Sequence, residues 1–195
     1  MTTGRRMMMW MGLGVALCLQ VVVAAEKGKP AAGGFGAPED ITFEAVFDRT
    51  PQKYVQLTPT KGVSPTKPVD VMLAFHGAGS DRWQYINVDR GECRGVREFA
   101  ATHGMILISP DYRASTSWMG PAAEEDVLQI IGQLRKKYKV GRIFLTGGSM
   151  GGTAVLIFAA LHPDLVDGVT SFNGRANMVD EDEKFQRFWP QIAAS

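Results

Sequence analysis

The sequence predicts an α/β protein in which a mostly parallel sheet lies between two layers of helices, the doubly wound arrangement. Short apolar, β-rich stretches alternate with longer stretches of helical character, and this alternation is typical of parallel strands joined by crossover helices. The clearest pair is Ile143–Leu145, a strand, followed by Thr153–Leu161, an Ala- and Leu-rich stretch long enough for a helix. In such a fold the functional site lies beyond the carboxyl ends of the strands.

The strands are expected where apolar or alternating residues end in turn residues. Ile41–Phe47 alternates and Tyr54–Leu57 follows it closely, so this pair is predicted to form the antiparallel edge of the sheet. The stretch Val69–Phe75 has the nearly continuous apolar pattern of a buried strand. Further strands are expected at residues 105–108 and 166–172.

The helices are expected between these strands. Residues 121–138 place apolar side chains on one face and begin with acidic residues, which suit the positive end of a helix dipole. Residues 94–102 are predicted to form a second helix that ends at His103 and Gly104. Residues 81–91 are expected to form a loop, and residues 182–194 a final helix.

The N-terminal residues 1–25 have the pattern of a signal peptide. Arg5 and Arg6 precede the apolar run Met7–Val23, and Val23–Ala25 ends in small residues before a polar segment. The alternative is a membrane anchor, although no stop-transfer flank follows the run. We expect a secreted or periplasmic protein, or otherwise an N-terminally anchored one. Residues 26–40, rich in glycine and alanine, are expected to be a flexible linker before a domain at 41–195.

The run Gly147–Gly151 matches the pattern G-x-S-x-G and lies between the predicted strand and helix described above. A strand that turns sharply into a helix brings backbone segments close together, which glycines permit. Ser149 at the apex would be held in a strained conformation with its hydroxyl exposed, the arrangement called a nucleophile elbow. A second motif, His76-Gly77-Ala78, follows the buried strand Val69–Phe75 directly.

Taken together, the stretch from about residue 69 to residue 173 resembles the α/β-hydrolase superfamily, with the form of its esterase and prolyl-oligopeptidase branches. The motifs that carry this resemblance occur in the superfamily's order: residues 75–79, 108–113, 146–152 and 160–165. The resemblance implies that Ser149 is the nucleophile and that the N–H groups of Ala78 and Met150 form the oxyanion hole. It also implies that His76, Gly77, Gly147 and Gly151 support the two loops.

The chain departs from this superfamily downstream of Ser149. The superfamily order predicts an acid and then a histidine on two further strands, but only His162 follows the serine. His162 closes the helix about 20 Å away, at a rise of about 1.5 Å per residue, and cannot reach Ser149. We therefore expect a fragment that lacks the last strands, with at most faint turnover. Asp180 is a less favoured position for the acid.

Aromatic and polar residues after the predicted strands are candidates for a substrate pocket. Trp83 and Tyr85 follow the His76 loop, Tyr112 and Trp118 follow the fourth strand, and Asn173 ends the sixth. The alternative is that the aromatic rings simply cover the end of the sheet.

The composition excludes several other classes of protein. The 195 residues carry a net charge of +1, which argues against a nucleic-acid partner. Neither metal-ligand spacing nor a phosphate loop occurs, so no metal and no cofactor are expected. Cys93 would be the one cysteine left after signal cleavage, and it is expected to be structural.

The sequence therefore predicts a serine hydrolase that cleaves ester or amide bonds through an acyl-enzyme on Ser149. The favoured form is a secreted carboxylesterase-like enzyme whose substrate is a small molecule or peptide, with membrane contact only through an uncleaved N-terminal segment. Two alternatives remain: a serine peptidase of the prolyl-oligopeptidase family, and a noncatalytic hydrolase-like binding domain.

Overall fold

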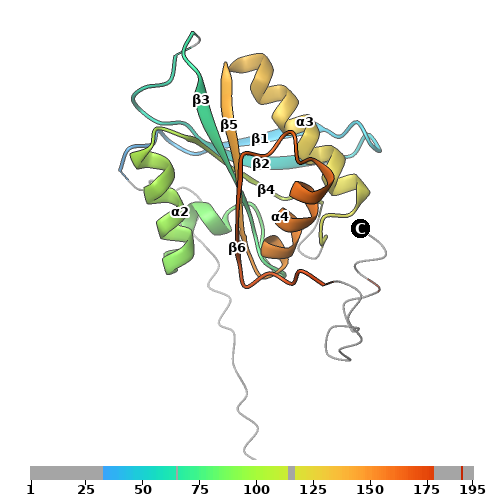
Figure 1. The fold of residues 1–195 in the computed structure, drawn as a ribbon. Coiled ribbons are helices and arrows are strands. Elements are labelled where there is room, and N and C mark those ends of the chain that lie inside the picture. Colours follow the sequence, from blue (N-terminus) through green and yellow to red (C-terminus); the bar gives the residue numbers. More distant parts are fainter. Residues whose placement is uncertain (1–32, 65, 114–116, 178–189, 191–195) are drawn as a thin grey trace, which may run out of the picture.

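Helices cover both faces of a central sheet in the computed structural model of the chain (Figure 1). The structure describes residues 33–64, 66–113, 117–177 and 190. The strands are β1 (Glu39–Glu44), β2 (Pro51–Leu57), β3 (Val69–Phe75), β4 (Ile106–Pro110), β5 (Val140–Gly148) and β6 (Gly168–Phe172). The helices of these ranges are α1 (Gln84–Asn87), α2 (Gly91–Thr102), α3 (Pro121–Lys137) and α4 (Met150–Leu161).

The sheet has the strand order β1-β2-β4-β3-β5-β6. β2 is antiparallel to both of its neighbours, whereas β4, β3, β5 and β6 run parallel. The carboxyl ends of these four parallel strands therefore meet at one edge of the sheet. The predicted α/β class and the predicted antiparallel edge are both confirmed, as is the strand Val69–Phe75 with its bounds.

The alternation of β3 divides the apolar side chains between two cores. Val71, Leu73 and Phe75 pack on the face covered by α3 and α4. Met72 and Ala74 point to the opposite face and pack with residues of α1 and α2. Because β3 lies in the middle of the sheet and is buried on both faces, its sequence is nearly continuous in apolar residues.

Several element bounds differ from the sequence-based expectation. The predicted loop 81–91 contains the one-turn helix α1, and α2 begins at Gly91 rather than at residue 94. The first strand covers 39–44, not 41–47, because residues 46–48 turn back toward β2. The structured part of the chain also begins inside the predicted linker, since Phe35 is buried and bridges Pro59.

Some predicted segments lie outside the described residues. They are the signal peptide at residues 1–25, Asp180, and all of the helix at 182–194 except residue 190. Within the described ranges, no helix is long and apolar enough to cross a membrane.

α4 packs unusually closely on the end of β3, and a glycine makes this approach possible. A side chain at Gly151 would overlap the carbonyl oxygen of Phe75 and crowd that of His76. Gly132, in the middle of α3, has open space where a side chain would be. Packing therefore requires a glycine at position 151 of α4, where the backbones are in close contact. It does not require one at position 132 of α3.

We predict that Gly151→Ala lowers the free energy of unfolding by about 3 kcal/mol or more, because the backbone of β3 must move to admit the methyl group. Gly132→Ala, the matched control, should raise it by about 0.5–1 kcal/mol, since alanine is the better helix former. Urea unfolding of both variants measures the difference. Equal effects of the two substitutions would contradict the close packing of α4 on β3.

Candidate active site

Ser149 occupies the sharp turn between β5 and α4, with a backbone conformation of φ 56° and ψ −116°. Residues other than glycine are strained at such values, which persist only where the surroundings impose them. The Ser149 N–H donates to the carbonyl oxygen of Phe172 (2.8 Å), and its own carbonyl oxygen accepts from the Thr153 N–H (3.0 Å). The side chain is exposed and makes no capping hydrogen bond. The predicted strand-turn-helix setting is therefore present.

Glycines on both sides of Ser149 allow this turn. A side chain at Gly147, in β5, would overlap the backbone of Gly151, at the start of α4. Gly152 and Gly174 meet in the same way, and this contact brings the segment after β6 against the start of α4. The turn thus depends on direct backbone contacts that any side chain would block.

The loop after β3 lies beside the turn at Ser149. A Cβ atom on Gly77 would lie 3.7 Å from the Ser149 Cβ atom and 3.3 Å from the Gly148 carbonyl oxygen. Ala78 is exposed, and its N–H has no acceptor among the described residues. Met150 is the first residue of α4, where backbone N–H groups lack partners within the helix. The two predicted oxyanion donors thus belong to adjacent segments.

His76 is fully buried, and hydrogen bonds hold its ring in place. Nδ1 lies 2.9 Å from the Gly77 carbonyl oxygen and Nε2 lies 3.2 Å from that of Asp111, so a neutral ring donates to one of them. Burial lowers the pKa of His76 below its usual 6.5, against the opposing effect of these carbonyl groups and of Asp111 and Asp81. The ring also packs against that of Tyr112. This environment is that of a residue that braces the loop.

The other two histidines lie far from Ser149 in the fold. His103 follows α2 and bonds the Phe99 carbonyl oxygen, as expected for the end of a helix. His162 follows α4 at the end opposite Ser149, and its Nε2 lies 2.8 Å from Glu124. In the part of the chain that the structure describes, no histidine is hydrogen-bonded to Ser149.

The candidate pocket residues are mostly buried. The exposed fractions of Trp83, Tyr85, Tyr112 and Trp118 are at most 8%, so these four rings offer little surface to a substrate. Their placement agrees with the alternative that aromatic rings cover the end of the sheet. Asn173 is exposed, with φ 56°. Cys93 is a buried free thiol, and burial raises its pKa, as expected of a structural cysteine.

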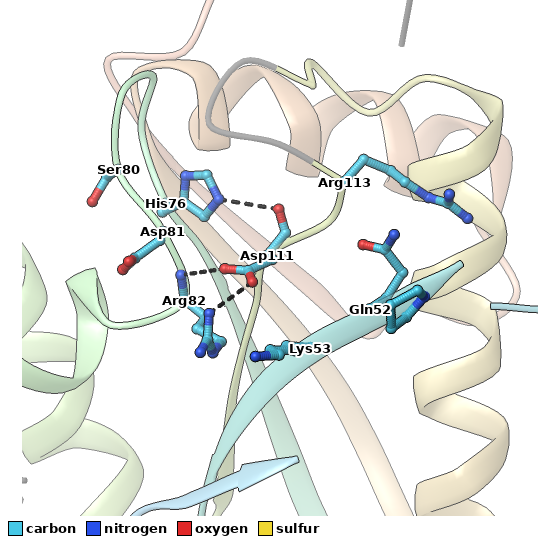
Figure 2. Close-up of a pocket in the computed structure, with 9 residues that line it drawn as sticks. Gln52, Lys53, His76, Ser80, Asp81, Arg82, Asp111 and Arg113 are labelled. Atoms are coloured by element: carbon cyan, nitrogen blue, oxygen red, sulfur yellow. Dashed lines mark hydrogen bonds and ion pairs between the residues drawn. The ribbon is translucent and has the colours of Figure 1, made fainter. Parts of the chain in front are cut away.

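A polar cavity of about 440 Å³ opens at the same edge of the sheet, on the side of β4 and β2 (Figure 2). Its wall includes Lys53, His76, Ser80, Asp81 and Asp111, together with Pro51, Gln52, Arg82 and Arg113. Ser149 does not line it. Figure 2 shows His76 and Arg82 both directed toward Asp111. The cavity therefore adjoins the loop after β3 and not the turn at Ser149.

Two arginines that the sequence did not single out hold the loops around this cavity. Arg82 pairs with Asp40 (2.7 Å) and Asp111 (2.9 Å). Arg113 pairs with Asp48 and with the buried Asp126, both at 2.6 Å. These pairs join the β1–β2 hairpin and α3 to the loops after β3 and β4. Arg113 lies in the motif at residues 108–113, but no local motif indicated the ion-pair partners of either arginine, because these partners are distant in the sequence.

The fold and the strained serine between β5 and α4 define a protein of the α/β class with a sharp strand-to-helix turn at Ser149. A family model described as the alpha/beta hydrolase fold matches residues 70–195, and the chain belongs to this family. The resemblance inferred from the sequence is thus confirmed.

Known proteins of several kinds are similar to this chain. Protein phosphatase methylesterase 1 of Candida albicans is 28% identical over 108 residues, which are 53% of this chain and 28% of that protein. An S-formylglutathione hydrolase of Agrobacterium tumefaciens superposes with a TM-score of 0.66 at 14% identity, over 88% of this chain and 69% of that one.

Two further structures show the same fold. FphF, a fluorophosphonate-binding serine hydrolase of Staphylococcus aureus, has a TM-score of 0.63 at 17% identity, covering 78% of this chain and 64% of that chain. A ferulic acid esterase of Anaeromyces mucronatus has a TM-score of 0.61 at 18% identity, covering 80% and 65%. The chain thus spans about two thirds of these structures and 28% of the curated relative.

We predict that the free energy of unfolding of Ser149→Gly is about 1–2 kcal/mol higher than that of Ser149→Ala. Both variants lose the hydroxyl group, but only glycine adopts a φ of 56° without strain. Chemical denaturation of the two variants in parallel isolates the backbone strain. A glycine variant no more stable than the alanine variant would show that the turn is not strained.

A second prediction concerns pH. Because the folded state lowers the pKa of His76, the unfolded chain binds the proton more readily, and stability falls as the pH falls below 6.5. His76→Gln should remove up to about 1.4 kcal/mol of this dependence per pH unit. Unfolding free energies of the two proteins at mildly acidic and neutral pH provide the measurement. Parallel pH profiles would show that His76 is not held neutral.

Proposed function

We propose that this chain carries the nucleophile and the oxyanion hole of a serine esterase. The observation that carries the proposal is the exposed Ser149 hydroxyl, held at φ 56° on a strand-to-helix turn beside Gly77. Strain of this kind at an exposed residue is typical of functional sites, because folding alone gains nothing from it. The same strain favours a catalytic protein over a noncatalytic binding domain.

The chemistry is acyl transfer in two steps. The Ser149 oxygen attacks the ester carbonyl carbon as its proton passes to a base, and the carbonyl oxygen becomes an oxyanion. The C–O bond to the alcohol then breaks, the base returns the proton to the alcohol, and an acyl-enzyme remains. Water attacks this intermediate in the same way, releasing the acid and restoring the serine hydroxyl. None of the three histidines of the chain, all of them in the described residues, bonds Ser149, so the proposal requires a histidine from outside these 195 residues as the base.

The oxyanion would accept hydrogen bonds from the backbone N–H groups of Ala78 and Met150. The Ala78 N–H has no acceptor among the described residues, and Met150 begins α4, whose dipole places positive charge at this end. One such donor is worth about 2.7–4 kcal/mol of transition-state stabilisation. Both donors are backbone groups, so their positions depend on the loops that carry them.

Esters are the favoured substrates because the similar proteins are named hydrolases, and two of those described above are named esterases. They include a protein phosphatase methylesterase, an S-formylglutathione hydrolase and a ferulic acid esterase. We further propose that the protein is secreted or periplasmic, on the signal-peptide pattern of residues 1–25. The prolyl-oligopeptidase alternative has no comparable support.

We predict that a fluorophosphonate probe labels Ser149 when the protein is expressed from its natural reading frame. The probe needs a serine activated by a base and an oxyanion hole for its phosphoryl oxygen. Ser149→Ala should abolish labelling, and Ala78→Pro should reduce it by about 10²–10³-fold, because proline has no N–H to donate. Peptide mass spectrometry locates the modified residue.

The control for this experiment lies in the other serines of the described segments. Ser64, Ser80, Ser109, Ser117 and Ser171 do not lie at a sharp turn from strand to helix and should remain unlabelled. Modification of any of them in place of Ser149, or equal labelling of Ser149→Ala, would overturn the proposed function.

A further inference from the structure

The one-turn helix α1 places a buried glutamine side chain against the loop after β3. The Oε1 atom of Gln84 accepts a hydrogen bond from the Gly77 N–H at 3.0 Å. Its Nε2 atom points toward the thiol of Cys93 at 3.9 Å, and the side chain is only 5% exposed. Without this amide oxygen the Gly77 N–H would be left unpaired, at a cost in free energy. The hydrogen bond therefore holds the Gly77 N–H in a fixed direction.

The peptide group that joins His76 to Gly77 is held at both of its ends. Gln84 binds its N–H, and the Tyr112 hydroxyl donates to its carbonyl oxygen at 2.6 Å. The next peptide group carries the Ala78 N–H. Its carbonyl oxygen, on Gly77, accepts from the Ser80 N–H at 3.2 Å and lies 2.9 Å from the His76 ring. The direction of the Ala78 N–H is thus set by bonds to the peptide groups around it.

The residue after Gln84 contacts the other half of the site. Tyr85 is fully buried, and its hydroxyl oxygen would lie 3.5 Å from a Cβ atom on Gly148, the residue before Ser149. Consecutive residues of α1 therefore touch the loop that carries Ala78 and the strand end that carries Ser149. α1 is placed to fix the separation of these two segments.

We propose that Gln84 is a positioning residue for the oxyanion hole: by holding the Gly77 N–H, it aims the Ala78 N–H at the oxygen of the reacting carbonyl group. This inference rests on the proposed function of Ser149. Gln84 touches neither the substrate nor the nucleophile. It acts only through the loop, so its loss should weaken transition-state binding more than substrate binding.

Steady-state hydrolysis of p-nitrophenyl acetate by the full-length protein tests the proposal. Gln84→Met keeps the size of the side chain but removes the acceptor, and kcat should fall by about 10–100-fold while KM changes by less than about twofold. Gln84→Glu keeps an acceptor oxygen and should restore kcat to within about threefold of the wild type. Loss with methionine and rescue with glutamate is the expected pattern.

Gln56→Met is the matched control. Gln56 is also a buried glutamine, but it lies in β2 and bonds Thr58 and Tyr138, away from the loop after β3. Its substitution should leave kcat within about twofold of the wild type, although it removes two hydrogen bonds. A loss of kcat in this variant equal to that in Gln84→Met would show a general effect of lost buried amides, and would overturn the proposal.

A second variant covers the case in which Gln84→Met does not fold. Gln84→Asn retains a buried amide but withdraws it by one methylene group, so it should lose kcat to a similar extent. An unchanged kcat in either folded variant overturns the role of Gln84. Fluorophosphonate labelling of Ser149 in the wild-type protein separates the two proposals. If Ser149 is labelled but Gln84 substitutions leave kcat unchanged, this inference alone is overturned. If Ser149 is not labelled, both proposals are overturned.

Discussion

The close approach of α4 to the end of β3 is the constraint on which the site depends. The backbone of Gly151 lies against the carbonyl groups of Phe75 and His76, and Gly147 lies against Gly151 across the turn. These contacts leave no room for a Cβ atom, and they bring the turn at Ser149 to the loop that carries Ala78. Ser149 is strained because packing fixes both β5 and α4, so the turn that joins them must adopt φ 56°.

Charge pairs fix the other side of the same sheet edge. Arg82 links Asp40 on β1 to Asp111 after β4, and Arg113 links the β1–β2 turn to Asp126 of α3. Burial raises the pKa of Asp126 while Arg113 lowers it, so the pair compensates for part of the cost of burying this charge. Such pairs add little net stability, but they determine where the loops lie. The polar cavity is bounded by these loops.

The described residues contribute to the candidate site in different ways. The described residues hold a serine and two backbone donors in fixed positions, and their only buried histidine serves the loop. Preorganised donors act without reorganisation when charge develops on the substrate. The proposed role of α1 belongs to this scheme, since its residues contact both the loop that carries Ala78 and the strand end before Ser149.

The sequence by itself determined the α/β class, the antiparallel edge, the strand Val69–Phe75 and the elbow at Ser149, because periodicity and glycine spacing are local signals. The bounds of the first strand and the start of the structured chain at Phe35 depended on partners across the sheet. Gln84 and Arg82 carry no local signal, since their partners Gly77 and Asp40 become neighbours only after folding. The aromatic residues of the loops were ambiguous for the same reason: a ring that covers the sheet end and one that lines a pocket look alike until burial is known.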